Sequence, residues 1–242
     1  MILAVLFLGT FLVAGSAVAI AINAIGGSGN EPSLQAVMDG VTVGGPSSLD
    51  FVGPDGANDA ITDTLDSYWE QFSSGGSTAV MIVEITANST RNSFGVYNPY
   101  TLATYELFDG GDEPEAQATL YVTDLVALGS YTFGFYLGIG DTTKFYSESA
   151  INPGGLDHMA AFQGVGDTLN LYPSLPNYTG KPWTSAEWVL AWEDASLGDF
   201  DYQDTVILIE SVQPVPEPAT MLLLGTGLLG LAALGRKKYL KK

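Results

Sequence analysis

Short runs rich in β-branched and aromatic residues follow one another from Thr78 to Ser211, divided by Gly, Asn, Asp and Pro. Such runs are typical of β-strands. No alternation of strands with helices, no glycine-rich phosphate loop after a strand and no repeat of 20 to 50 residues occurs among them. The pattern predicts a mainly β fold, an antiparallel and jelly-roll-like β-sandwich, and argues against nucleotide binding. The seven runs are residues 78–87, 93–97, 101–108, 118–125, 131–138, 187–193 and 204–211.

A different spacing precedes these runs. Residues 58–72 place hydrophobic side chains four, four and three positions apart, with Asn58 or Asp59 available as the N-cap, which predicts one short amphipathic helix. The hydrophobic positions are Ile61, Leu65, Trp69 and Phe72. Residues 25–57 are rich in Gly, Pro, Ser and Asn and are interpreted as a flexible lead-in. The β-sandwich domain is therefore assigned to residues 58–213.

The N-terminus is hydrophobic without interruption. Ile2 to Ile22 contains no charged residue, and Ala17-Val18-Ala19 suits a signal peptidase. Residues 1–24 are predicted to be a signal peptide. Because no basic residue precedes the hydrophobic stretch, an uncleaved anchor stays the alternative.

The C-terminus carries a second hydrophobic stretch. Ala219 to Gly235 gives 17 residues without a charge, about the shortest helix that crosses a hydrocarbon layer roughly 30 Å thick. A stop-transfer cluster, Arg236, Lys237 and Lys238, follows at once. Basic flanks stay in the cytoplasm, so the body is expected outside the inner membrane.

The triplet Pro216-Glu217-Pro218, the hydrophobic span 219–235 and the basic cluster occur in a fixed order. This arrangement, in residues 214–242, resembles the PEP-CTERM sorting signal of Gram-negative bacteria and covers about the last tenth of the chain. The resemblance implies an exosortase as partner, which cuts near the triplet after transient membrane anchoring. It also implies a place on the cell surface or in the extracellular matrix, with exopolysaccharide and biofilm association.

Charge is distributed very unevenly. Ahead of the basic cluster, three basic residues, Arg91, Lys144 and Lys181, face all 27 acidic residues. Such a body repels nucleic acid and attracts cations. The chain has no cysteine, which excludes disulfides, thiolate metal sites and cysteine nucleophiles.

Five carboxylates crowd into twelve residues between two hydrophobic runs. They are Glu193, Asp194, Asp199, Asp201 and Asp204. Crowding of this kind is unfavourable unless a cation lies among the acids, and oxygen ligands on a loop favour Ca²⁺. The spacing departs from the EF-hand pattern, and a solvated acidic loop is the alternative.

The segments 145–162 and 190–204 are similar to a domain family of unknown function in bacterial extracellular proteins, including calcium-dependent adhesins. The likeness extends over residues 79–211 and rests on Asn152, on the pair Asp157 and His158, and on the five carboxylates. It implies a β-fold with calcium sites and supplies no reaction. As the single histidine, His158 is expected to be structural rather than a general base.

These observations predict a non-enzymatic surface or matrix protein that binds calcium and acts in adhesion or exopolysaccharide association. The alternatives are a secreted glycoside hydrolase and a calcium-dependent carbohydrate-binding module. The hydrolase would use a pair of carboxylates for the chemistry. In both alternatives Trp183, Trp188 and Trp192, which lie near the acidic segment, would stack on sugars.

Overall fold

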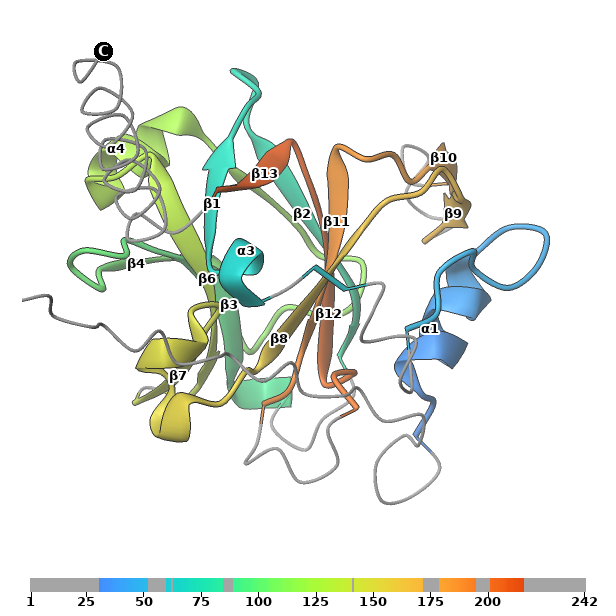
Figure 1. The fold of residues 1–242 in the computed structure, drawn as a ribbon, viewed down its shortest axis with the longest axis horizontal. Coiled ribbons are helices and arrows are strands. Elements are labelled where there is room, and N and C mark those ends of the chain that lie inside the picture. Colours follow the sequence, from blue (N-terminus) through green and yellow to red (C-terminus); the bar gives the residue numbers. More distant parts are fainter. Residues whose placement is uncertain are drawn as a thin grey trace, which may run out of the picture.

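Two antiparallel β-sheets contribute to one hydrophobic core (Figure 1). The computed structural model describes residues 31–51, 60–61, 63–84, 89–140, 142–171, 179–194 and 201–215. The predicted signal peptide and the predicted C-terminal membrane helix lie outside these residues. Of the helices within the described ranges, none is long and apolar enough to cross a bilayer.

The first sheet has six strands in the order β13-β1-β6-β3-β4, with β7 also paired to β6. Its inner face supplies a row of large aromatic side chains to the core, among them Trp69, Phe94 and Phe135. The strands are β1 (Tyr68–Gln71), β3 (Asn92–Tyr97), β4 (Thr104–Phe108), β6 (Thr132–Ile139), β7 (Thr143–Tyr146) and β13 (Val212–Val215).

The second sheet has five strands in the order β5-β2-β12-β11-β8. Its inner face packs in the core shared with the first sheet, and its outer face packs under helix α1 (Leu34–Val41) and Phe51. Because both faces are buried, β11 and β12 are almost uninterrupted hydrophobic runs. The strands are β2 (Ser77–Glu84), β5 (Gln117–Leu120), β8 (Met159–Gln163), β11 (Glu187–Trp192) and β12 (Thr205–Glu210).

Smaller elements complete the fold. The strands β9 (Thr168–Asn170) and β10 (Thr179–Pro182) pair with each other and form a separate two-stranded sheet. Short 3₁₀ helices occupy Ser89–Arg91, Ser149–Ile151 and Pro153–Gly155. The predicted mainly β, antiparallel fold is confirmed, and the two sheets that share one core fit a sandwich.

The predicted amphipathic helix over residues 58–72 is wrong for most of its length. The helix α3 covers only Asp63–Asp66, and Tyr68–Gln71 form strand β1 between β13 and β6. Trp69 is fully buried, whereas Leu65 and Phe72 are about half exposed (42% and 50%). Pairing on both sides of β1 therefore outweighs the helical spacing, because it satisfies the strand's backbone groups and buries Trp69.

The run 118–125 also differs from the prediction, because it contains two elements. Strand β5 ends at Leu120, and helix α4 (Val122–Leu128) follows. The Asp124 carboxylate accepts a hydrogen bond of 2.8 Å from the Tyr121 backbone N–H at the start of this helix. That contact gives the Tyr121 N–H, at the N-cap of the helix, a hydrogen-bond acceptor. It stabilises the start of a helix directly after Leu120, where strand β5 ends.

The segment interpreted as a flexible lead-in contains helix α1. Ser33 is its N-cap, with Oγ accepting from the Ala36 N–H at 3.2 Å. Leu34 and Met38 are fully buried against the outer face of the five-stranded sheet. Residues 34–51 are therefore part of the folded body, although their Gly- and Ser-rich composition is typical of a flexible segment.

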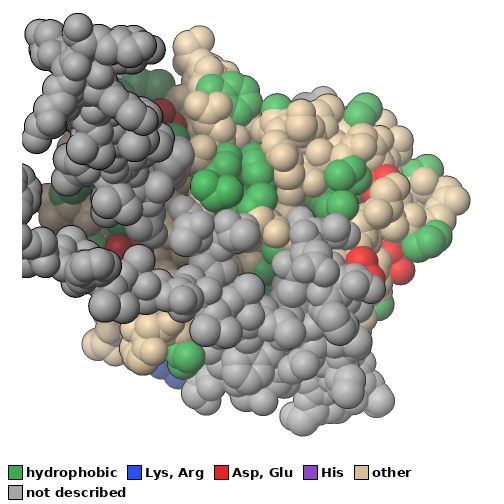
Figure 2. Space-filling model, in the orientation of Figure 1, with side chains coloured by type: hydrophobic (Ala, Val, Ile, Leu, Met, Phe, Trp, Pro, Cys, Tyr) green, Lys and Arg blue, Asp and Glu red, His purple; other side chains and the backbone are tan. Residues whose placement is uncertain are grey.

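The described surface is sparsely charged. Charged residues make up 14% of the chain, and on the face in Figure 2 hydrophobic and uncharged polar groups cover most of the described area. We therefore expect charged residues to influence binding or stability mainly where several of them lie close together.

Candidate functional site

The strand register brings most of the predicted acidic residues to one end of the five-stranded sheet. Trp192 at the end of β11 pairs with Thr205 on β12 and with Met159 on β8, and Thr205 pairs with Glu84 on β2. Acidic residues beside these strand ends are therefore neighbours although they are far apart in sequence. We call this set the acidic end; it comprises Glu84, Asp157, Glu193, Asp194, Asp201 and Asp204.

Hydrogen bonds connect the members of the acidic end. The Asp194 backbone N–H donates to Asp204 Oδ2 at 2.8 Å. Asn92, at the start of β3 in the opposite sheet, donates from Nδ2 to Asp194 Oδ2 at 3.1 Å. Gln203 donates from Nε2 to Asp201 Oδ2 at 3.0 Å. The acidic end therefore reaches across both sheets.

Burial makes this negative charge unfavourable. Glu193, Asp194 and Asp201 are each at most 2% exposed. Burial, together with repulsion from these three carboxylates, raises the pKa of Asp204 to about 8 despite the hydrogen bond from the Asp194 N–H. Burial likewise raises the pKa of Glu84 to about 7, against a hydrogen bond with Asn92. The site therefore favours either a bound proton or a bound cation.

Two buried amide oxygens at the acidic end accept no hydrogen bond from the residues that the structure describes. They are Asn92 Oδ1 and Gln203 Oε1, on side chains that are 3% and 1% exposed. A buried acceptor without a donor is unfavourable, and carbonyl-type oxygens are ligands that Ca²⁺ accepts beside carboxylates. The chemistry of the available oxygens fits a hard cation.

The predicted ligands are only partly assembled among the residues that the structure describes. In these ranges, no three His, Asp or Glu side chains are grouped so that they could hold a metal ion. Asp199 lies outside the described residues, as do Pro216, Glu217 and Pro218 and the cluster Arg236, Lys237 and Lys238. The calcium site stays a prediction that involves Asp199 as well as the described carboxylates Glu193, Asp194, Asp201 and Asp204.

His158 is a buried neighbour of the acidic end and contacts the backbone of Glu193. It is 1% exposed, its ring stacks on Phe145 with centroids 3.7 Å apart, and its Nδ1 lies 2.9 Å from the Glu193 carbonyl oxygen. Burial lowers the pKa of His158, although the hydrogen bond to Glu193 opposes the shift. The hydrogen bonds of the Asn152 side chain are with other residues, because it bonds to the backbone of Tyr146 and Leu156.

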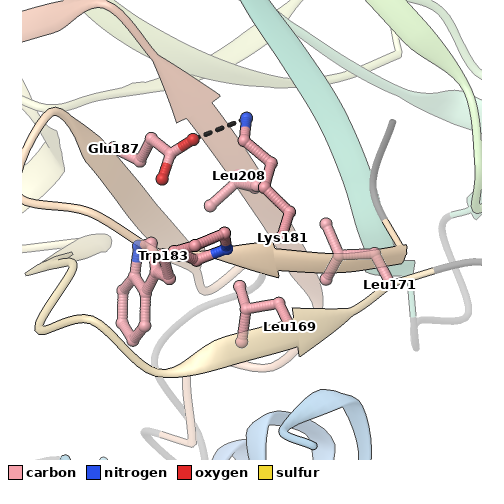
Figure 3. A pocket seen from close by; sticks show the side chains of 7 residues that line it. Leu169, Leu171, Lys181, Trp183, Glu187 and Leu208 are labelled. Carbon is pink, nitrogen blue, oxygen red and sulfur yellow. Dashed lines mark ion pairs between the residues drawn. The ribbon is translucent and has the colours of Figure 1, made fainter. Parts of the chain in front are cut away.

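The tryptophans near the acidic segment are core residues. Trp183, Trp188 and Trp192 are 1%, 2% and 0% exposed, so they offer no face to a sugar and the stacking interpretation is wrong. Trp183 lines a small apolar space beneath the Lys181–Glu187 ion pair (Figure 3), and that space has no room for a water molecule.

Sequence reasoning missed Glu84, Asn92 and Gln203. Glu84 had a signal, since it is the charged residue within the hydrophobic run 78–87. Gln203 lies between two acidic residues of the same segment. Asn92 had none, because only the packing of one sheet against the other brings it to Asp194.

Residues 214–238 match the PEP-CTERM protein-sorting motif. The match confirms the predicted sorting signal and identifies an exported, exosortase-sorted protein that is anchored in the membrane before cleavage. No curated protein and no solved structure matches the chain.

Proposed function

We propose that the chain is a non-catalytic surface or matrix protein that acts in adhesion or exopolysaccharide association after exosortase processing. The observation that carries this proposal is the position of the sorting motif. The match begins at residue 214, inside β13 (Val212–Val215), so the sorting signal overlaps the last strand of the sheet in sequence. A tail joined to the fold in this way delivers the β-domain itself as cargo.

Processing can be tested in cells that contain an exosortase and in matched cells that lack it. Replacing Pro216, Glu217 and Pro218 together by Ala should leave the chain uncut and membrane-bound in both. Gln213→Ala, just outside the matched residues, should be processed like the wild type. Immunoblotting of membrane and medium fractions measures the outcome, and processing of the triple variant would refute the assignment.

We further propose that the acidic end binds Ca²⁺. The residues that would hold the ion are Glu193, Asp194, Asp199, Asp201 and Asp204, with Asn92 Oδ1 and Gln203 Oε1 as neutral oxygens. Three observations support this: the burial of the carboxylates, the raised pKa of Asp204, and the two amide oxygens that have no donor within the described part of the chain. The bound ion would neutralise the buried charge and connect β11 and β12 to β3.

Isothermal titration calorimetry of the detergent-solubilised chain with CaCl₂ tests this site. Asp204→Asn should weaken binding by about tenfold or more, since it removes a charged ligand from a buried site. Glu106→Gln, which removes the same charge from an exposed position on β4, should bind like the wild type. Equal affinities for Asp204→Asn and the wild type would contradict the site.

A further inference from the structure

A polar groove of about 730 Å³ lies at the edge where the 3₁₀ helix Ser89–Arg91 meets the turn after β4. Its volume falls in the range of small-molecule sites, about 300–1,000 Å³. All the side chains that line it are polar or charged, and the other positions are glycines. The lining residues are Thr90, Arg91, Ser93, Glu106, Asp109, Gly110, Gly111 and Gly140.

The walls of the groove are held in place by close backbone contacts. A Cβ added at Gly110 would lie 2.5 Å from the Thr90 carbonyl oxygen, so the two walls touch directly and only glycine fits. Within the turn, the Gly111 N–H donates to Asp109 Oδ1 at 2.7 Å. The groove is therefore formed before any ligand arrives, which lowers the entropic cost of binding.

Arg91 is fixed along one side. Its carbonyl oxygen accepts from the Gly140 N–H at 2.8 Å, and a Cβ at Gly140 would lie 2.9 Å from its Nη2. Lys181 is held by Glu187 and Glu210, and Lys144 lies over the Tyr136 ring, but Arg91 has no ion pair within the described part of the chain. Its guanidinium donors are available to a ligand.

The mixture of groups selects the ligand class. Arg91 offers donors in a planar fork, and Glu106 and Asp109 offer carboxylate acceptors in the same groove. An apolar ligand finds no hydrophobic side chain among the lining residues, and a polyanion meets two carboxylates on an acidic body. A ligand with neighbouring hydroxyls, each of which can donate and accept a hydrogen bond, matches both the arginine donors and the carboxylate acceptors. Such hydroxyls are the repeating feature of a neutral sugar.

We propose that this groove binds a short segment of a neutral polysaccharide, with Arg91 donating to sugar oxygens and Glu106 and Asp109 accepting from sugar hydroxyls. The proposal rests on the proposed exopolysaccharide association and names the site for it. The groove is built by β3, β4 and the loop after β6, and none of its lining residues belongs to the acidic end.

The test uses the full chain in a detergent without a sugar headgroup, titrated with cellotetraose, maltotetraose and tetra-N-acetylchitotetraose, and with tetragalacturonate as the anionic comparison. At least one neutral tetrasaccharide should bind more tightly than tetragalacturonate. Arg91→Ala and Glu106→Gln should each weaken that binding by about tenfold or more, because each removes charged hydrogen bonds. Lys144→Ala, a basic residue outside the groove, should leave it unchanged. Arg91→Lys, which keeps the charge without the fork, should bind with intermediate affinity.

The proposal is overturned if no neutral tetrasaccharide binds, if tetragalacturonate binds more tightly than all three, or if Arg91→Ala and Glu106→Gln both bind like the wild type while circular dichroism shows them folded. Tail cleavage in cells is a separate readout, which these variants leave intact. Loss of cleavage with retained sugar binding would refute the sorting proposal alone, and normal cleavage without sugar binding would refute the groove alone.

Discussion

Glu84 connects the protonation of a single side chain to the stability of the whole fold. Its pKa is raised to about 7 by burial, so the folded state holds the proton more tightly than the unfolded state does. Its stabilising contribution is complete below the ordinary pKa near 4.5 and is lost as the pH rises through 7. The fold therefore carries an unfavourable carboxylate above neutral pH.

Glu84→Gln should remove this dependence. In chelator, the variant should be more stable relative to the wild type at pH 8 than at pH 5, as measured by denaturant unfolding with tryptophan fluorescence. The difference between variant and wild type is the quantity to compare, because the lowered pKa of His158 acts in the opposite direction. The same difference at both pH values would show that Glu84 is not buried as described.

Gly134 on β6 makes room for a buried tyrosine. A Cβ at this position would lie 2.2 Å from Tyr97 Cε1, and Tyr97 is fully buried. Gly134→Ala should therefore lower the free energy of unfolding by about 1–3 kcal/mol, as overpacking does. Gly40→Ala is the matched control, since nothing lies within 4 Å of the added Cβ in helix α1. It should raise stability by about 0.5–1 kcal/mol, and a loss for both variants would point to a different packing.

At the scale of elements, Lys181 adds an ionic attachment to the buried apolar contacts that hold the β9–β10 hairpin. Lys181 Nζ on β10 lies 2.5 Å from Glu187 on β11 and 2.8 Å from Glu210 on β12. Burial alone would lower the pKa of Lys181, but the hydrogen bonds and charges of the two glutamates raise it. The two ion pairs of Lys181 connect the hairpin to the five-stranded sheet.

Lys181→Met should destabilise the protein by about 1–3 kcal/mol, because Glu187 is 4% exposed and would lose its cation. Lys144→Met removes a lysine that lies 5.3 Å above the Tyr136 ring and should cost less, about 0.5–1 kcal/mol. Adding Glu187→Gln to Lys181→Met should recover part of the loss in thermal melting. No recovery would mean that the loss reflects packing of the lysine stem rather than the buried charge.

Sequence reasoning found the strands that lie in long runs of β-branched and aromatic residues, including the partly exposed β4. β2, β11 and β12 lie inside the molecule, and their long hydrophobic runs leave no other interpretation. β9, β10 and β13 are three or four residues long and largely polar or exposed, so pairing rather than composition defines them. β1 was mistaken for a helix because four residues cannot establish a period against a longer spacing of three and four.

The candidate site follows the same logic. Crowding along the sequence identified Glu193, Asp194, Asp201 and Asp204 as a group, since they flank one connection between two paired strands. The groove beside Arg91 could not be found in this way, because its walls come from three separate segments, residues 90–93, residues 106–111 and Gly140. Sequence patterns locate sites made by one loop, whereas sites between loops need the fold.

At the scale of the whole molecule, two kinds of charge effect have to be separated. With three basic residues ahead of the C-terminal cluster against 27 acidic ones, the body repels itself, and any salt should stabilise it by screening. A specific calcium site adds stability by mass action, which depends on Ca²⁺ concentration at constant ionic strength. Melting temperatures in NaCl and in CaCl₂ at matched ionic strength distinguish the two.

The wild type should melt at a higher temperature in CaCl₂ than in NaCl, and the excess should grow with each increase in Ca²⁺ above saturation, since the added stability follows RT ln(1 + [L]/Kd). Asp204→Asn should show a smaller excess at each Ca²⁺ concentration and keep the rise that NaCl gives, because one charge among 27 hardly changes the general repulsion. An equal rise in both salts for the wild type would assign the whole effect to screening. Protons would then neutralise Glu84 and Asp204, whose pKa values are raised to about 7 and about 8, and the stability that these two groups contribute would be lost as the pH rises through those values.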